Sequence, residues 1–274
     1  MRPTGEVRLL RDAYGGRFGV LITCRYPDPD TVTPAGGADE HVFLIDVDTC
    51  SSIVEVVDAS VHDGPADAAD AWRGSVGAPA AAAEPAPVDA ALLADLLPTP
   101  GTGDLGVMGG ETRGRMDNYY RVLRRSDDLA QVLATAGRPL PTESRWLVQA
   151  RDGLPVDSYV EEFLDWYPTD AAPADPDAVA ALAETWLEGT LPETRLSCSP
   201  HRVRNLQALI AIEWHDEPLV EQVAVLLPHW TRWCAYRTGL DQQLTARSLA
   251  AAQRDPREWT RIQDEEPAGA PVPE

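Results

Sequence analysis

The C-terminal stretch 199–255 constrains the fold most, because apolar residues recur along it at helical spacing with few interruptions. A serine followed by Pro200 is typical of a helix start, since the hydroxyl caps free N–H groups and proline tolerates the first turn. Gly239 and Asp241 indicate the end of one helix and the cap of the next. We therefore expect three neighbouring helices, with a kink or a break at Pro228.

The beginning of the chain has the alternation and the β-branched content of strands. Strands are predicted at residues 18–24, 41–46 and 53–61, followed by a short helix at 65–72. The predicted fold class is therefore α+β, with a small N-terminal α/β portion that contains a short sheet, followed by a larger all-helical C-terminal domain.

Residues 78–88 are almost entirely alanine and proline, a composition typical of a mobile tether. We place the domain boundary at this linker. The prediction is a small α/β domain at 1–77, a helical domain at 89–262, and an acidic, proline-rich tail at 263–274 that is disordered.

The charge of the chain restricts its partners. Asp and Glu total 44 and Lys and Arg total 23, which gives a formal net charge of -21. This charge repels nucleic-acid backbones and anionic membranes, so neither is expected as a partner. Every basic residue is an arginine, which excludes a P-loop, kinase-type or Schiff-base lysine.

The cysteines and the hydropathy pattern indicate a cytoplasmic protein. The four cysteines show no C-x-x-C spacing, the N-terminus has no signal-like apolar run, and no stretch approaches the roughly 20 apolar residues of a membrane span. We expect reduced thiols, a cytoplasmic location and no cofactor.

An enzymatic hypothesis comes from Asp46 and Asp48, which follow an apolar strand. In haloacid-dehalogenase-type phosphatases a strand-end aspartate attacks phosphorus and a second aspartate serves as acid or base. Here Thr49 stands one position early and no lysine is present to hold the phosphate. The alternative is that the two aspartates end a strand and cap a turn.

Two further patterns invite a ligand-binding interpretation. His201, His215 and His229 are spaced by fourteen residues each, but none forms an H-x-x-x-H or H-E-x-x-H pair, so partly exposed histidines are the alternative to a metal site. Gly101, Gly103 and Gly106 match a dinucleotide fingerprint as a string, yet a proline pair precedes them where a strand is needed, which favours a loop.

A cluster of aromatic and arginine side chains indicates a protein-binding surface. Such residues are enriched at interfaces, where rigid rings and planar guanidinium groups give much contact for little entropy. The alternative is that they pack against helices of the same chain. The cluster consists of Trp230, Arg232, Trp233, Tyr236 and Arg237.

A second arginine-rich stretch lies further upstream. We expect it to pair internally with acidic residues, with phosphate or a nucleotide as the alternative. It consists of Arg113, Arg115, Arg121, Arg124 and Arg125.

The pattern Leu226-Leu227-Pro228-x-Trp230-x-Arg232-Trp233-x-x-x-Arg237-Thr238-Gly239-Leu240 resembles the C-terminal segment of uncharacterised hypothetical proteins of actinobacteria. The resemblance implies a bacterial, cytoplasmic source and brings no activity, cofactor or catalytic residue with it.

Taken together, these patterns favour a non-enzymatic interaction or regulatory protein whose Trp/Arg-rich helices bind a partner or a second copy. One alternative is a metal-dependent phosphate-ester hydrolase that uses Asp46 and Asp48. Another is an acidic decoy that imitates nucleic acid and occupies a DNA-binding protein.

Overall fold

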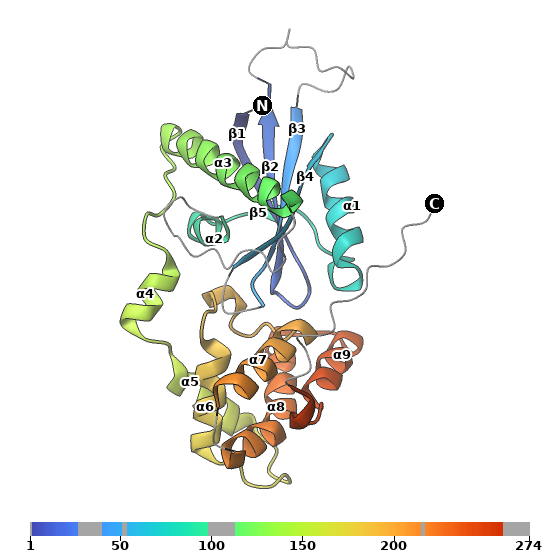
Figure 1. Cartoon of the computed structure of the whole chain (residues 1–274), viewed down its shortest axis with the longest axis vertical. Helices are drawn as coiled ribbons and strands as arrows, with labels where there is room; N and C mark the ends of the chain where they lie inside the picture. The colour runs from blue at the N-terminus through green and yellow to red at the C-terminus, as the bar shows by residue number, and fades with distance from the viewer. Residues whose placement is uncertain (1, 27–39, 51–53, 98–112, 215–216, 260–274) are drawn as a thin grey trace. The chain divides into compact units, whose positions relative to one another are not determined.

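The chain forms two compact units, which we describe separately on a computed structural model (Figure 1). The structure describes residues 2–26, 40–50, 54–97, 113–214 and 217–259. The predicted tail at 263–274 lies outside the described residues. Unit 1 comprises residues 1–153 and 189–194, and unit 2 comprises residues 154–188 and 195–274.

Unit 1 is built on an antiparallel sheet of five strands in the order β4-β3-β2-β1-β5. Strands β1 to β4 pair in chain order and form a meander, and the short strand β5 pairs with β1 at the edge of the sheet opposite β4. The interior strand β3 is buried along most of its length, as its continuous apolar run predicts. The strands are β1 (Arg2–Arg11), β2 (Arg17–Arg25), β3 (Glu40–Asp48), β4 (Glu55–His62) and β5 (Ala86–Pro87).

Helices cover both faces of this sheet (Figure 1). One face packs against α2 (Ala90–Leu96) and α3 (Arg113–Thr135), and the opposite face packs against α1 (Pro65–Val76). Helix α4 (Arg145–Asp152) contacts α2. Because successive strand residues point to opposite faces, this arrangement gives unit 1 two apolar clusters, one on each side of the sheet.

The α1 side of the sheet depends on a close approach between a ring and a strand. A Cβ placed on Gly19 of β2 would lie 3.0 Å from the ring of Trp72, which is itself fully buried on α1. The Trp72 indole Nε1 donates to Asp46 Oδ1 at 3.0 Å. Glycine at this position therefore makes room for the indole that fixes α1 on the sheet.

The alanine- and proline-rich segment differs from the predicted linker. Residues 78–80 form a 3-10 turn, η1 (Ala78–Ala80), Ala80 is fully buried, and β5 extends the sheet. Ala13 also donates its N–H to the Pro79 carbonyl at 2.8 Å. The segment is thus part of unit 1, and the division between units falls after Gly153 because α2, α3 and α4 belong with the sheet.

A short segment between the helices of unit 2 returns to unit 1. Residues 189–194 include the turn η2 (Pro192–Thr194), and Leu191 is fully buried in the cluster beneath α2 and α3. The Arg145 guanidinium forms an ion pair with Glu193 at 2.7 Å, and Arg11 donates to the Glu193 carbonyl. The chain therefore crosses between the units three times.

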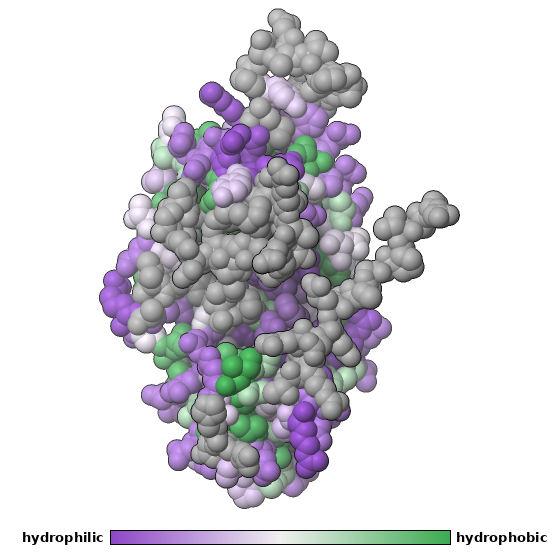
Figure 2. All heavy atoms as spheres, viewed as in Figure 1, coloured by the Kyte–Doolittle hydropathy of each residue, from purple (hydrophilic) through white to green (hydrophobic). Residues whose placement is uncertain are grey.

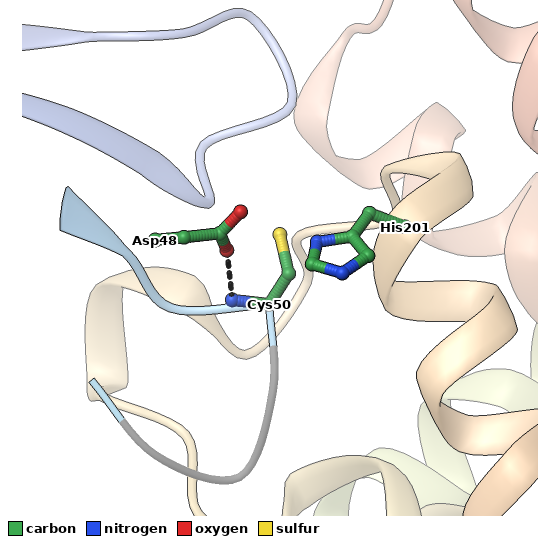
Figure 3. Close-up of side chains that lie close together, drawn as sticks. All are labelled: Asp48, Cys50 and His201. Carbon is green, nitrogen blue, oxygen red and sulfur yellow. Dashed lines mark hydrogen bonds between the residues drawn. The ribbon is translucent and has the colours of Figure 1, made fainter. Parts of the chain in front are cut away.

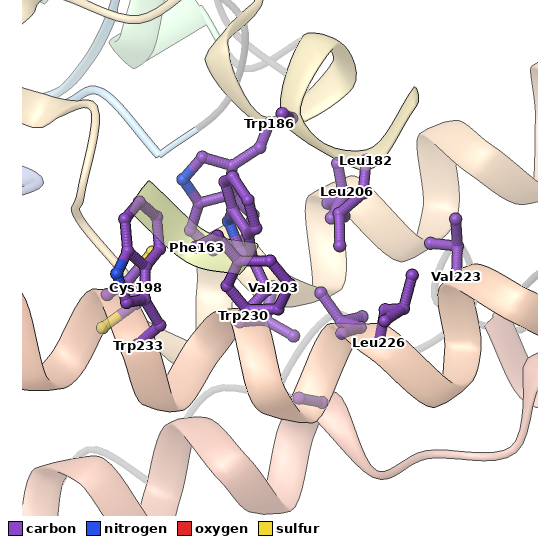
Figure 4. Close-up of a cluster of buried hydrophobic side chains, with 14 of the residues drawn as sticks. Phe163, Leu182, Trp186, Cys198, Val203, Leu206, Val223, Leu226, Trp230 and Trp233 are labelled. Carbon is purple, nitrogen blue, oxygen red and sulfur yellow. The ribbon is translucent and has the colours of Figure 1, made fainter. Parts of the chain in front are cut away.

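Unit 2 consists of helices packed around one aromatic cluster. Its helices are α5 (Val156–Trp166), α6 (Pro176–Leu187), α7 (Pro200–Glu213), α8 (Glu217–Thr238) and α9 (Gln242–Ala252). Phe163 of α5 lies 5.1 Å from the Trp230 ring and 5.7 Å from the Trp233 ring, and these indoles lie 4.9 Å from each other (Figure 4). This cluster joins α5 to α8 through rings that are almost fully buried.

Several sequence predictions are confirmed. The α+β class holds, and Ser199 and Asp241 cap α7 and α9 by accepting N–H bonds from the first turns. Gly239 takes a φ of 66°, as expected of a residue that ends a helix.

Other expectations differ from the structure. Helix α8 continues through Pro228, which excludes the break but not the kink that was expected there. Strand β1 has no counterpart among the predicted strands. None of the described helices combines the length and the apolar character needed to cross a bilayer.

We predict that Gly19→Ala lowers the free energy of unfolding of unit 1 by about 1–3 kcal/mol, because the added methyl group overlaps the Trp72 ring. Urea titration followed by tryptophan fluorescence measures the change. Gly74→Ala in α1 is the matched control. It meets no atom within 4 Å and is expected to stabilise by about 0.5–1 kcal/mol. Equal effects of the two changes would contradict the packing argument.

Candidate functional site

The structure divides the predicted aromatic and arginine cluster into a buried part and an exposed part. Trp230 and Trp233 belong to the core of unit 2, where both side chains are almost fully buried (Figure 4). They are therefore not available to a partner. Positions 230 and 233 fall on the face of α8 that carries Leu226 and Leu227, whereas Arg232 and Tyr236 fall on the opposite face.

The exposed part forms an ordered surface on α5 and α8. Tyr236 is 69 % exposed, yet its ring stacks on Trp166 with centroids 6.3 Å apart and an interplanar angle of 29°. Arg237 forms an ion pair with Glu162, and its guanidinium lies 5.6 Å from the centroid of the Trp233 ring. Both side chains therefore have fixed neighbours although they face solvent.

Helix α5 supplies the residues that sequence reasoning missed. Glu162 and Trp166 are one helical turn apart, so they lie on the same side of α5. They neighbour Phe163, which anchors that helix on the tryptophans of α8. The i, i+4 spacing of Glu162 and Trp166 can be seen in the sequence, but the contact of these residues with α8 depends on tertiary packing. We call Glu162, Trp166, Arg232, Tyr236 and Arg237 the α5–α8 surface.

The histidines proposed as metal ligands have separate environments. His201 is exposed on α7, where its ring lies 3.3 Å from the Asn205 amide nitrogen. His229 is half-buried on α8, and its ring lies 5.0 Å from the Tyr167 ring. Burial and then the nearby Arg232 charge lower the pKa of His229 below its usual value, so the ring is neutral at pH 7. His215 lies outside the described residues.

The Asp46 carboxylate is engaged by protein donors. Arg17 donates to it from Nε at 2.9 Å and from Nη2 at 2.6 Å, and Trp72 Nε1 donates to Oδ1 at 3.0 Å. The side chain is buried. Both carboxylate oxygens thus have partners within unit 1, which favours a structural role that joins β2, β3 and α1.

Two further aspartates lie at the same end of unit 1. Asp48 accepts the Cys50 backbone N–H at 2.6 Å (Figure 3). Asp12, which the sequence analysis did not single out, accepts the Gly16 N–H at 2.9 Å in the turn between β1 and β2. Burial, with a smaller contribution from the Asp48 charge, raises the pKa of Asp12 to about 6. This corner holds three buried carboxylates, those of Asp12, Asp46 and Asp48.

The remaining sequence candidates are only partly described. Gly101, Gly103 and Gly106 lie outside the described residues, as do the side chains of Arg113 and Arg115. Further along α3, Arg125 pairs with Asp128 at 3.0 Å. The Arg121 guanidinium lies 6.0 Å from the Phe43 ring centroid. Both contacts are internal to unit 1, and the Arg125 pair agrees with the expected pairing to an acidic residue, whereas Arg121 contacts a ring.

We predict that Trp230→Ala lowers the free energy of unfolding of unit 2 by about 3–5 kcal/mol, because it removes a fully buried indole from the centre of the aromatic cluster. Near-UV circular dichroism with urea titration measures the loss. Tyr236→Ala serves as the control on the same helix, since that ring is mostly exposed. A stable, native-like Trp230→Ala chain would show that the indole is not needed for the fold.

We predict that Asp12→Asn gains stability relative to the native chain as the pH rises. The folded pKa of Asp12 is about 6 against an ordinary 3.8, so ionisation between these values costs free energy only in the folded state. Between about pH 4 and pH 7 the difference in unfolding free energy moves toward the variant by up to about 3 kcal/mol. The Asn Oδ1 still accepts the turn N–H groups. A difference independent of pH would contradict the raised pKa.

The described part of the chain thus offers one exposed, ordered surface in unit 2 and one buried carboxylate corner in unit 1. Comparison with protein-family models, curated proteins and solved structures found no match to the chain. The functional conclusion consequently rests on the residues themselves.

Proposed function

We propose that this protein is a non-enzymatic, cytoplasmic interaction protein and that the α5–α8 surface is where it binds another protein chain. The proposal depends on Tyr236, which combines two properties. Its ring is mostly exposed and is also held in place by stacking on Trp166. A large ring that is already ordered loses little conformational entropy when a partner covers it.

The arginines give the surface a second kind of contact. Arg232 is exposed one helical turn before Tyr236, and no ion pair to it is present among the described residues. A guanidinium of this kind offers five N–H donors to carboxylates or carbonyl oxygens of a partner and also stacks on rings. Arg237 forms an ion pair with Glu162. The surface therefore presents one guanidinium that is paired and one, that of Arg232, without an ion pair among the described residues.

Exposed large hydrophobic residues on α8 are few, which supports a localised surface and not a generally apolar one. Over the described parts of the face drawn in Figure 2, hydrophilic side chains predominate, and hydrophobic side chains are gathered in smaller groups. Large exposed hydrophobic residues on α8 are Val225 and Tyr236. A few exposed anchors within a polar surround are typical of a protein-binding surface.

The hydrolase alternative has weaker support. A nucleophilic aspartate needs a carboxylate oxygen directed at its substrate, whereas both Asp46 oxygens accept bonds from Arg17 or Trp72. Asp48 caps a backbone N–H group. The acidic decoy rests on the net charge alone.

The proposal predicts that Arg232→Ala combined with Tyr236→Ala weakens association at least about tenfold, because it removes the available guanidinium and the exposed ring together. Association is read from purified chain by sedimentation velocity and from host lysate by affinity capture with quantitative mass spectrometry.

Arg247→Ala on α9 is the matched control, since Arg247 is exposed on a neighbouring helix outside the surface. Circular dichroism establishes that each variant keeps its fold. Association left unchanged by the double substitution in both measurements would remove the proposal.

A further inference from the structure

One face of α8 carries a line of side chains that is largely exposed, although Tyr167 and Trp166 contact two of its members. Val225, His229, Arg232 and Tyr236 follow one another at spacings of four, three and four residues, which places them along a single stripe of the helix. Val225 is 63 % exposed and Tyr236 69 % exposed, Arg232 is exposed, and His229 is half-buried. The buried face of α8 lies on the opposite side and carries the tryptophans of the core.

We infer that this stripe pairs with the same stripe of a second copy of the chain, with the two α8 helices antiparallel. The inference rests on the proposed function and names its partner. Because the midpoint of the stripe lies between His229 and Arg232, an antiparallel pair places Val225 opposite Tyr236 of the partner copy. The same symmetry places Arg232 opposite His229 of the partner copy.

Each of these pairs is chemically complementary. Valine against a tyrosine ring buries two apolar surfaces that are otherwise in water. A guanidinium over an imidazole ring is attractive when the ring is neutral. His229 is neutral at pH 7 because burial and Arg232 lower its pKa. Among the described residues, the titratable or charged groups near His229 are Arg232 on its own helix and Tyr167 at the C-terminal end of α5.

The charge pattern favours a second copy at this place. Two chains of net charge -21 repel each other over most of their surfaces. Residues 222–240 of α8 and its C-cap contain neither aspartate nor glutamate, although the whole chain has 44. The stripe is therefore a line along which two like-charged copies can approach with little local repulsion.

The neighbouring side chains reduce the cost of pairing. The stacking of Trp166 fixes Tyr236, and the Glu162 ion pair fixes Arg237 beside it. The partner copy thus meets a preformed surface, and fewer side chains need to be ordered on association.

The test is a site-directed photo-cross-link in the full-length chain. Gln222→Cys adds a thiol at an exposed position beside the stripe, and a benzophenone maleimide labels it while the four native cysteines are buried. Labelled chain is mixed with isotopically heavy chain, irradiated and digested. Antiparallel pairing predicts cross-links to heavy peptides around 236–240, because positions 222 and 239 are symmetric about the stripe's midpoint.

The outcomes separate the alternatives. Parallel pairing would place the cross-links near residue 222 of the heavy chain, about 26 Å from residue 239 along the helix axis, and would overturn the inference. Cross-links spread over unit 1 would also overturn it. Arg247→Cys on α9, labelled in the same way, is the control and should give no cross-link to 236–240.

Salt and concentration give an independent readout. Sedimentation of the purified chain should show a dimer that strengthens severalfold from about 50 mM to about 500 mM salt, because screening reduces repulsion between acidic copies. A dimer that weakens with salt would overturn the inference. If the chain stays monomeric while capture from lysate still depends on Tyr236, self-pairing is refuted but the proposed function is retained. The partner would then be a different, acidic protein. A monomer with unchanged capture would refute both.

Discussion

The mutual packing of Phe163, Trp230 and Trp233 is the interaction on which unit 2 depends. These three rings lie about a ring diameter apart and join α5 to α8. Once the tryptophans point inward, helical geometry leaves the side of α8 with Arg232 and Tyr236 facing outward. The same contact brings Trp166 of α5 next to Tyr236. The position of the α5–α8 surface therefore follows from how the core is packed, and a change in the core would displace it.

Unit 1 contains buried carboxylates that are stabilised by hydrogen bonds. Its sheet carries three buried aspartates at one end, and each is held by neighbouring donors: Arg17 and Trp72 for Asp46, and backbone N–H groups for Asp12 and Asp48. Buried carboxylates are tolerated only when such donors replace water. The corner thus uses its polar groups to define the strand ends and the position of α1. The raised pKa of Asp12 shows that this replacement is incomplete.

Local signals in the sequence were sufficient for much of the fold but not for the site. Caps such as Ser199 and Asp241 act within one turn, so the residues around them determine the outcome. Strand β1 and the role of the alanine- and proline-rich segment depend on pairing with distant residues, such as Leu9 with Ala86, which composition does not encode. Aromatic and arginine enrichment at 230–237 indicated α8, the helix on which the exposed Arg232 and Tyr236 lie. Burial of Trp230 and exposure of Tyr236 follow only from the direction in which α5 docks.

The return of residues 189–194 to unit 1 has a consequence for how this protein can be divided or recombined. Leu191 fills a place in the sheet's core, yet its neighbours on both sides in the chain belong to the helical unit. A gene fragment that encodes everything from Leu154 onward would carry this leucine without the pocket made for it. Neither unit can therefore be transferred intact into another protein by itself. Recombination of complete domains would have to transfer both units together.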